Sequence, residues 1–261
     1  MNDLILEICA EKKIKVESLS NDYILKLTIG DDVKFIYGGR WDINTAASDR
    51  IASDKFACYI LMDGLPRIEH ELIFNPCRRF DYIQPNGTWL KALGYYEKHN
   101  RKLVAKPNQG SGGTKVFYCD SPPSLERAIH AIFAENPDAV LSPYHEINYE
   151  YRVFYLNGRA LYAYGKKADK SWMHNLSQGA IAFEITDTSL LAEIKDLACL
   201  AAKRINIHFA TVDIAHLKSG ELAIMEINSG IFANQLLNQL PHLKCVIKDI
   251  YTEAILPNTS V

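Results

Sequence analysis

Carboxylate and amide side chains in the last fifth of the chain recur with a spacing that could bind a divalent cation. Residues 210–228 form two apolar-rich runs around Ser219-Gly220, which predicts a β-hairpin with a two-residue turn. In that register Asp213 lies opposite Glu226, and Asn228 projects from the same face. Two facing carboxylates repel unless a proton or a cation lies between them, and an all-oxygen ligand set suits Mg²⁺. The competing interpretation is the solvated outer face of a surface hairpin.

A glycine-rich loop lies between two predicted strands within residues 103–119. Glycine lets backbone N–H groups approach phosphate oxygens closely, and Lys106 adds a positive charge at the base of the loop. The flanking strands and the glycine spacing exclude a P-loop and a dinucleotide-binding turn, because both of those run into a helix. A phosphate-binding tip and a flexible surface hairpin remain as alternatives. The loop residues in question are Gly110, Ser111, Gly112 and Gly113.

A third hairpin is predicted over residues 149–167, where Asn157-Gly158 is a strong two-residue turn signal. Charged residues on one face could bind phosphate, a carboxylate or ribose hydroxyls, opposite small residues that leave an open concavity. A β-bulge would turn Lys166 inward in place of its neighbour, and a mutually neutralising surface cluster is the alternative to a site. The regular register places on this face Glu150, Arg152, Ala163, Gly165 and Lys167.

The composition limits the classes of partner. With 261 residues, of which 48% are hydrophobic, the chain is long enough to bury a core. A formal net charge of -2 gives no general attraction for nucleic acid or for an anionic membrane, so any anion site must be local. The six cysteines are widely spaced, which argues against a zinc site or a disulfide framework. The sequence shows neither a signal-peptide pattern nor a membrane-length apolar run, and we expect a soluble cytoplasmic protein.

The rest of the pattern predicts an α+β protein in which helices join these hairpins. A capped amphipathic helix is expected from Ser53, with Phe56, Ala57, Ile60 and Leu61 on its buried face. Other helices are expected at the N-terminus and near residues 124–135, 188–204 and 232–255. Strands are expected near residues 23–29, 33–37, 103–107, 115–119, 139–142, 149–156, 159–166, 208–217 and 221–227.

Five groups of residues, taken in chain order, resemble the motifs of the ATP-grasp superfamily. They are Ser53-Asp54-Lys55, Lys106 with the glycine loop, Glu150-Tyr151-Arg152, Asn175 ahead of Gly179, and Asp213 with Glu226 and Asn228. The likeness is greatest to the cyanophycin synthetase, glutamate ligase and glutathione synthetase-like branch. It implies an α+β fold whose two lobes grip ATP. Residues 1–52 would then be a shortened N-terminal α/β segment, residues 53–143 the lobe with the glycine loop, and residues 144–261 the lobe with the metal site.

The resemblance also implies how ATP would be bound. Two lysines and the glycine loop would contact the phosphates, and the backbone of residues 142–145, between the lobes, would contact adenine. A carboxylate, Glu150 or its competitor Glu146, would bind the ribose. The implied nucleotide-binding residues are Lys55, Lys106, Gly110, Ser111, Gly112, Gly113, Ser142, Tyr144, Glu146 and Glu150.

Metal binding and catalysis are implied in the same way. Two Mg²⁺ ions, replaceable by Mn²⁺, would be held by Asp213, Glu226 and Asn228. Arg152 and Lys167 would stabilise charge in the reaction, and Arg152 and Asn175 would also contact substrate. Some peptide-forming members have an arginine two residues before the first metal carboxylate, where this chain has Thr211.

The activity that the resemblance implies is an ATP-dependent ligase forming a C–N bond. Such an enzyme joins a small carboxylate to an amine, an amino acid or a peptide, through an acyl phosphate, and releases ADP and phosphate. We expect neither nucleic acid nor a membrane as partner, and a homodimer is compatible with the sequence. An ATP-grasp kinase acting on a small molecule and a non-catalytic ATP-binding module are the alternatives.

Overall fold

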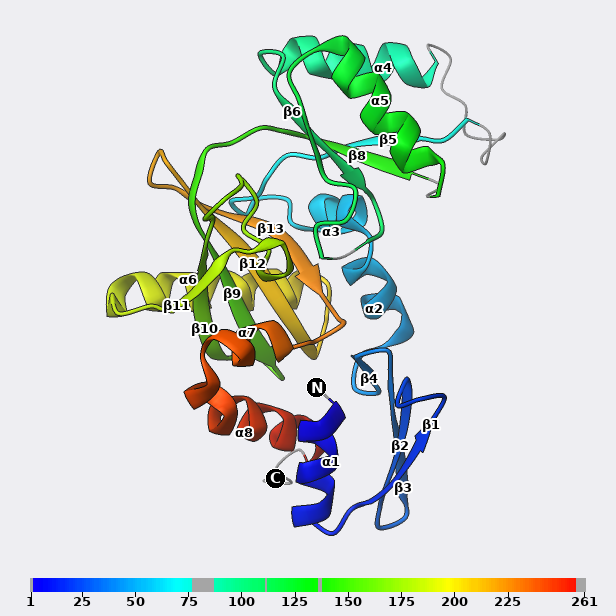
Figure 1. The fold of residues 1–261 in the computed structure, drawn as a ribbon, viewed down its shortest axis with the longest axis vertical. Coiled ribbons are helices and arrows are strands. Elements are labelled where there is room, and N and C mark those ends of the chain that lie inside the picture. The colour runs from blue at the N-terminus through cyan, green and yellow to red at the C-terminus, as the bar shows by residue number, and fades with distance from the viewer. Residues whose placement is uncertain (1, 77–86, 111, 136–137, 257–261) are drawn as a thin grey trace.

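The computed structural model describes residues 2–76, 87–110, 112–135 and 138–256. Within these ranges the chain is α+β, as predicted, and is built around three antiparallel sheets (Figure 1). The N-terminal sheet has the strand order β1-β2-β3-β4, the second sheet β5-β8-β6-β7, and the third β11-β10-β9-β12-β13. The site lies where the second and third sheets meet.

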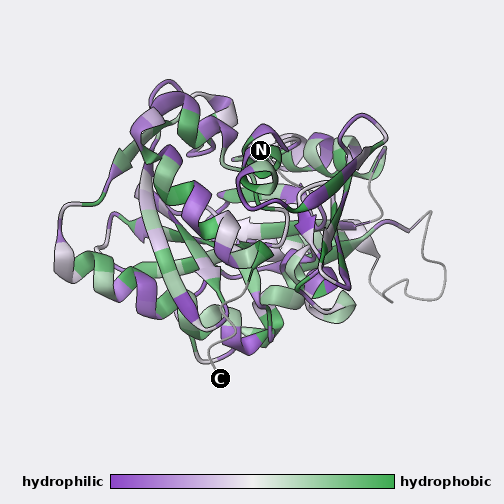
Figure 2. Cartoon of the chain, turned by 90° about the horizontal axis from the view of Figure 1, so that it is seen from below, coloured by the Kyte–Doolittle hydropathy of each residue, from purple (hydrophilic) through white to green (hydrophobic). Residues whose placement is uncertain are grey.

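The helices of the described residues pack against these sheets, and α3 lies between the second and third of them (Figure 1). Figure 2 shows hydrophobic and hydrophilic residues alternating around them, as expected when each helix buries one side. The helices are α1 (Asn2–Glu11), α2 (Ala46–Ala52), α3 (Lys55–Leu61), α4 (Thr88–Lys98), α5 (Pro122–Phe133), α6 (Thr188–Arg204), α7 (Asn234–Gln239) and α8 (Lys244–Ile255), with 3₁₀ turns η2 (Leu176–Gln178) and η3 (Pro241–Leu243).

The strands follow the sheets in chain order. The N-terminal sheet contains β1 (Lys15–Leu19), β2 (Ile24–Ile29), β3 (Asp32–Tyr37) and β4 (Arg40–Trp41). The second sheet contains β5 (Glu71–Phe74), β6 (Leu103–Pro107), β7 (Phe117–Cys119) and β8 (Asp138–Pro143). The third sheet contains β9 (Ile147–Leu156), β10 (Arg159–Lys167), β11 (Ile181–Glu184), β12 (Phe209–Leu217) and β13 (Leu222–Asn228).

The N-terminal unit is fastened to the third sheet rather than standing apart. Helix α1 lies beside α8 (Figure 1), and Lys248 bonds Glu7 at 2.9 Å and Glu11 at 2.5 Å across the two helices. Just after β4, the Asn44 side chain accepts hydrogen bonds from the His208 and Phe209 N–H groups at 2.9 and 2.8 Å. It also donates one to the Phe209 carbonyl at 2.8 Å. One amide side chain therefore fixes this segment to the start of β12.

The second sheet carries the glycine loop between β6 and β7, with α4 and α5 packed on it. Helix α5 begins at a defined point because the Ser121 side chain accepts from the Ser124 N–H and a proline occupies the first helical position. Its buried face is formed by Leu125, Ala128, Ile129 and Ile132. This packing supports β6, and with it Lys106, on the face of the second sheet that α5 covers.

The third sheet is covered differently on its two faces. On one face α6 packs over alternate residues such as Tyr151, Val153 and Val212. On the other face the far end is apolar, where Phe154 and Tyr164 pack in one core with α1 and α8. Toward the second sheet this same face turns charged, because the next residues in the alternation are the charged members of the predicted hairpins. The charged end of one sheet face is thus supported by a packed core.

Several predicted details of the helices are wrong. Ile60 and Leu61 are 53% and 40% exposed, because α3 begins at Lys55 with Asp54 as its cap and buries Lys55 and Cys58 instead. The helix predicted over residues 232–255 is divided into α7 and α8 by the 3₁₀ turn that starts at Pro241, since proline cannot continue a helical ladder. Helices α2 and α4 and strands β1, β4, β5 and β11 were not predicted.

No helix in the described ranges has both the length and the apolar composition needed to cross a bilayer.

The Asn44 contacts lead to a prediction about stability. Replacing Asn44 by Ala should lower the free energy of unfolding by about 2 kcal/mol, because three backbone hydrogen bonds lose their partner. Chemical denaturation followed by circular dichroism measures this. The exposed Asn148, replaced by Ala, serves as the control and should change stability by less than about 0.5 kcal/mol. Equal stability of the two variants would contradict the anchoring role.

Candidate active site

The β12–β13 hairpin brings Asp213 directly opposite Glu226, as predicted. The predicted two-residue turn is wrong, because the Leu217 N–H donates to the Glu221 carbonyl at 2.9 Å and three residues form the turn. Ile214 then faces Ile224, and a bulge at Met225 restores the expected pairing. The two irregularities cancel, so the carboxylates face each other despite the misjudged turn.

Asn228 joins the two carboxylates on the same face of the hairpin. Its Nδ2 lies 3.3 Å from Asp213 Oδ2 and 3.2 Å from Glu226 Oε1. Both carboxylates therefore converge on one point, and Asp213 is almost fully buried whereas Glu226 is partly open to the cleft. Two carboxylates, together with an amide that can turn its oxygen toward them, fit Mg²⁺ or Mn²⁺.

The β9–β10 hairpin has a bulge that changes which lysine enters the site. Leu156 faces Arg159, as predicted, but the register shifts between Ala160 and Tyr162, and Lys166 becomes the residue opposite Glu150. The prediction of Lys167 as the inward lysine is wrong: Lys167 is exposed, and Lys166 is 1% exposed. Lys166 Nζ contacts the Glu150 carboxylate and lies 3.2 Å from Asp213 Oδ1. One extra residue reverses the alternation from that point on.

The same bulge moves the predicted small residues to the other face. Gly165 faces Tyr151 and Ala163 faces Val153, both on the side covered by α6. The Phe183 ring packs so closely over Gly165 that a Cβ there would lie 2.1 Å from a ring carbon. The concavity expected opposite the charged residues is therefore not formed by Ala163 and Gly165. Tyr164 faces Arg152 instead.

Arg152 makes a two-point contact with Asp213. Its Nε lies 2.7 Å from Oδ1, and its Nη2 lies 2.5 Å from Oδ2. Burial would by itself raise the pKa of Asp213, but Arg152 and Lys166 reverse that effect and hold the pKa well below its ordinary value. Asp213 is therefore a carboxylate anion, held between two cations.

Two further lysines enter the cleft, one from α3 and one from β6 of the second sheet. Lys55, at the start of α3, donates to the Gly110 carbonyl at 2.9 Å and lies 3.7 Å from Glu226 Oε2. Lys106, on β6, is buried, and burial together with the neighbouring Lys55 lowers its pKa to about 8 although Glu226 acts in the opposite direction. The structure thus brings both predicted phosphate-binding lysines to the side of the cleft that faces the carboxylates.

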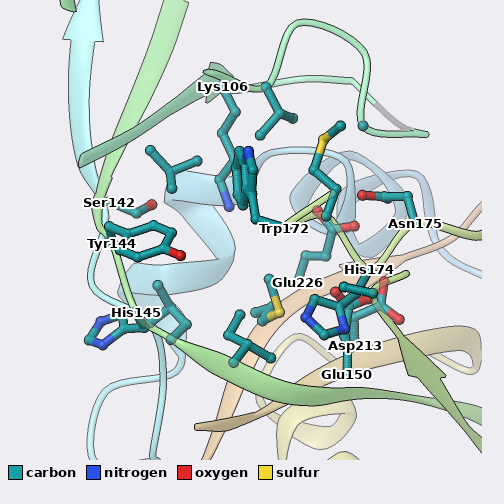
Figure 3. A pocket seen from close by; sticks show the side chains of 18 of the residues that line it. Lys106, Ser142, Tyr144, His145, Glu150, Trp172, His174, Asn175, Asp213 and Glu226 are labelled. Carbon is teal, nitrogen blue, oxygen red and sulfur yellow. The ribbon is translucent and has the colours of Figure 1, made fainter. Parts of the chain in front are cut away.

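A cavity of about 290 Å³ lies between the two lobes. Figure 3 shows Ser142, Tyr144 and His145 along one side, with Lys106 reaching in and Glu150, Asp213 and Glu226 gathered at the other end. Apolar side chains from both lobes complete its wall: Ile68, Val104, Val116, Ile147 and Met225. An apolar slot with a charged end suits a ligand that has a flat ring system and a polyanionic tail.

The strand between the lobes carries the predicted adenine-side residues. The Ser142 hydroxyl is within 2.9 Å of His70 Nδ1, which fixes it against the first lobe. Tyr144 packs edge-on to Tyr118 at 4.8 Å and to Trp172 at 6.1 Å between ring centroids. Trp172 is the residue that sequence reasoning missed at this end. Its only signal was an aromatic side chain three residues before the predicted substrate contact Asn175, which packing inside a core explains equally well.

The glycine loop lies against the second lobe. The Gly112 carbonyl accepts hydrogen bonds from Ser177 Oγ at 3.1 Å and from Gln178 Nε2 at 3.3 Å. Gly113 has a φ of 74°, and a Cβ there would lie 3.0 Å from Asn175 Oδ1, so glycine is required for both conformation and space. The predicted Asn175 is thus placed beside the loop, whereas Ser111 lies outside the described residues.

The two carboxylates considered for the ribose hydroxyls lie at different depths. Glu150 is buried and contacts Lys166. Glu146 is exposed at the rim of the cavity and pairs with Lys218 at 2.9 Å. Both side chains line the cavity, so either one is placed to reach a bound nucleotide.

Residues 100–234 match the family model of an ATP-grasp domain, and the match covers just over half of the chain. This chain belongs to the ATP-grasp family. The match contains the glycine loop, the strand between the lobes and the cluster around Asp213, so it covers most of the site described above. The fold expected from the sequence is confirmed.

Solved structures with the same fold include ligases. D-alanyl-alanine synthetase A from Vibrio cholerae aligns with a TM-score of 0.66 and 12% identity over 97% of this chain and 91% of that chain. D-alanine–D-alanine ligase from Bacillus anthracis aligns with a TM-score of 0.62 and 16% identity over 81% and 70%. A bifunctional glutathione synthetase from Pasteurella multocida gives 0.56 and 16% over 96% and 44%. At these identities the likeness concerns the fold. No curated protein matched the sequence.

The register of β10 leads to a prediction that separates two adjacent lysines. Lys166→Met should destabilise the ATP-grasp domain by about 3 kcal/mol, because it leaves Glu150 and Asp213 with an uncompensated buried charge. Lys167→Met should change stability by less than about 0.5 kcal/mol, because that side chain is exposed. Urea denaturation of the two variants checks the expectation. A larger loss of stability at Lys167 than at Lys166 would contradict the bulge and support the regular register.

The lowered pKa of Lys106 leads to a prediction about pH. A lysine that binds phosphate must be a cation, so with Lys106 in that role the affinity for a non-hydrolysable ATP analogue should be constant below about pH 8 and fall above it, by at most about tenfold per pH unit. Equilibrium titrations between about pH 7 and about pH 9.5 at constant ionic strength measure this. Lys106→Met should bind more weakly and lose most of the fall. A wild-type affinity that stays constant to the highest pH would contradict a phosphate-binding role.

Proposed function

We propose that this chain is an ATP-dependent ligase that activates a small carboxylate as an acyl phosphate and joins it to an amine, forming an amide or peptide bond. The observation that carries the proposal is the meeting of two unlike groups across one cleft. Lysines from α3 and β6 and a glycine loop lie on one side, and two carboxylates that converge on an amide side chain lie on the other. That combination suits a metal-bound triphosphate whose terminal phosphoryl group is to be transferred.

The proposed nucleotide pose follows the lining of the cavity. Adenine fits the apolar slot beside Tyr144 and Trp172, and the phosphates extend toward Lys55 and Lys106. The glycine loop would cover them, since Gly112 is already bonded to Ser177 of the second lobe. A covered site excludes water, which would otherwise hydrolyse an acyl phosphate.

Two Mg²⁺ ions are the cofactor that the family and the donor set suggest. Asp213, Glu226 and Asn228 would hold them, and bound metal would neutralise charge on the triphosphate. The chain's own cations act beside that site. Arg152 and Lys166 lie on the same sheet face and are placed to stabilise negative charge that develops on the transferring group or on the tetrahedral intermediate. Thr211 offers no such charge, so these two residues take that role.

The substrates are proposed as a small acid and an amine of the amino-acid or peptide class. Two neighbours of the same fold are described as D-alanine–D-alanine ligase and glutathione synthetase, and both names denote ligases of amino-acid substrates. In this chain the segment around Trp172 and Asn175 lines the cleft beside the glycine loop and is placed to contact an acceptor.

The test uses substrates whose carboxylate oxygens are labelled with ¹⁸O. Purified protein with MgATP and pools of amino acids or dipeptides should release ADP and phosphate, together with a product whose mass equals the two substrates less water. One label should appear in the released phosphate, because the acyl phosphate is cleaved at the acyl carbon. ADP with a stable phosphorylated product would indicate a kinase, AMP with pyrophosphate would rule out the acyl phosphate, and ATP binding without turnover would indicate a binding module.

A matched pair of variants tests the metal assignment in the same assay. Glu226→Gln should lower turnover by about a hundredfold or more, because the amide cannot supply the second carboxylate. Glu221→Gln, on the exposed turn of the same hairpin, should be close to wild type. Full activity of the Glu226 variant would refute the role of this carboxylate.

A further inference from the structure

Every acceptor position of the Asp213 carboxylate is already used within the protein. Oδ1 receives Arg152 Nε at 2.7 Å and Lys166 Nζ at 3.2 Å. Oδ2 receives Arg152 Nη2 at 2.5 Å and Asn228 Nδ2 at 3.3 Å. A carboxylate has about four lone-pair sites. Asn228 must turn its Nδ2 away before its oxygen can bind a metal ion, which frees one position on Oδ2 but leaves both cations on Asp213. A metal ion at Asp213 therefore competes with Arg152 and Lys166.

The surroundings identify which of these two cations leaves. Lys166 is 1% exposed and also contacts Glu150, so its movement would remove an ion-pair partner from two buried carboxylates at once. The Arg152 side chain is 23% exposed and has room to move. Arg152 Nη2 donates to Asp213 Oδ2. This oxygen also accepts from Asn228 and so faces the proposed metal position. Arg152 is the group that a metal would replace.

The charges of the cleft oppose a metal ion that arrives alone. Among the described residues that line the cavity or pair directly with its carboxylates, the inner cations are Lys55, Lys106, Arg152 and Lys166, and the inner anions are Glu150, Asp213 and Glu226. Glu146 and Lys218 neutralise each other at the rim. One positive charge is in excess, so a free dication is repelled and a triphosphate is attracted.

We infer that Arg152 occupies the place of a metal cation on Asp213 until a nucleotide brings the metal with it. Arg152 is then a positioning residue. It keeps Asp213 ionised and correctly oriented in the empty site, prevents free divalent ions from binding, and is released toward the phosphates when MgATP enters. This inference rests on the proposed metal–ATP site and adds the order of binding, with metal and nucleotide entering together.

Binding of Mn²⁺ in the absence of nucleotide is the decisive measurement. Electron paramagnetic resonance at constant ionic strength counts free Mn²⁺ directly. Wild type should bind it weakly, and Arg152→Gln should bind it about tenfold or more tightly, because a neutral amide replaces the competing charge. Arg159→Gln is the control and should match wild type. It removes an exposed arginine of the same β9–β10 hairpin, which pairs with Glu253 of α8. An Arg152 variant that binds Mn²⁺ no more tightly than wild type would overturn the inference.

A second measurement uses the unaltered side chain, and so it does not depend on the folding of a variant. In ¹⁵N-arginine NMR spectra the Arg152 Nε–H, assigned by its absence in Arg152→Lys, should exchange slowly with water because it is bonded to Asp213. The signal should shift on addition of Mg²⁺ with a non-hydrolysable ATP analogue and stay in place with Mg²⁺ alone. A signal that is unchanged by the metal–nucleotide complex would overturn the exchange.

The failure of this inference is distinct from failure of the proposed function. If the wild-type protein does not bind the ATP analogue with Mg²⁺, the proposed nucleotide site itself is refuted. Wild-type binding of the analogue, combined with unchanged Mn²⁺ affinity in Arg152→Gln, would leave the ligase proposal intact and refute only the exchange on Asp213.

Discussion

The ion-pair network around Asp213 is the interaction on which the rest of the site depends. Burying an isolated carboxylate is very unfavourable, and two hydrogen-bonded cations offset that cost here. The partners come from β9 and β10, and Asn228 comes from β13, so four neighbouring strands must keep one register for the network to form. The charge requirement of one side chain thus constrains the alignment of most of the third sheet.

The face of the third sheet that carries the network combines two environments. At one end Phe154 and Tyr164 pack in a core with the terminal helices, and at the other end the same alternation presents Arg152 and Lys166. Because the apolar end is close-packed, the charged end is held rigidly without being buried under a helix of its own. A rigid support of this kind lets fixed charges act on a ligand with little reorganisation.

The two sides of the cleft contribute different parts of the chemistry. The second sheet supplies the glycine loop and Lys106, α3 supplies Lys55, and the third sheet supplies the carboxylates. Lys55 bridges them, because its amine contacts both the Gly110 carbonyl and Glu226. Membership of the ATP-grasp family accounts for this division. The N-terminal unit, fixed through Asn44, supports the third sheet from the end remote from the cleft.

The sequence by itself determined the α+β class and the ATP-grasp resemblance, because strand alternation is a local signal. It also placed Asp213 opposite Glu226, although that pairing depends on a three-residue turn and a bulge at Met225 that the sequence did not show. It did not determine which of Lys166 and Lys167 enters the site, nor the buried face of α3. A single bulged residue reverses the alternation of a strand, and the bulge in β10 lies between Ala160 and Tyr162, where the strand pairs with β9 and packs in the core covered by α6. Likewise, the contact of Arg152 with both oxygens of Asp213 joins residues distant in the chain. Only tertiary structure decides such contacts, since they depend on how separate hairpins align across a sheet.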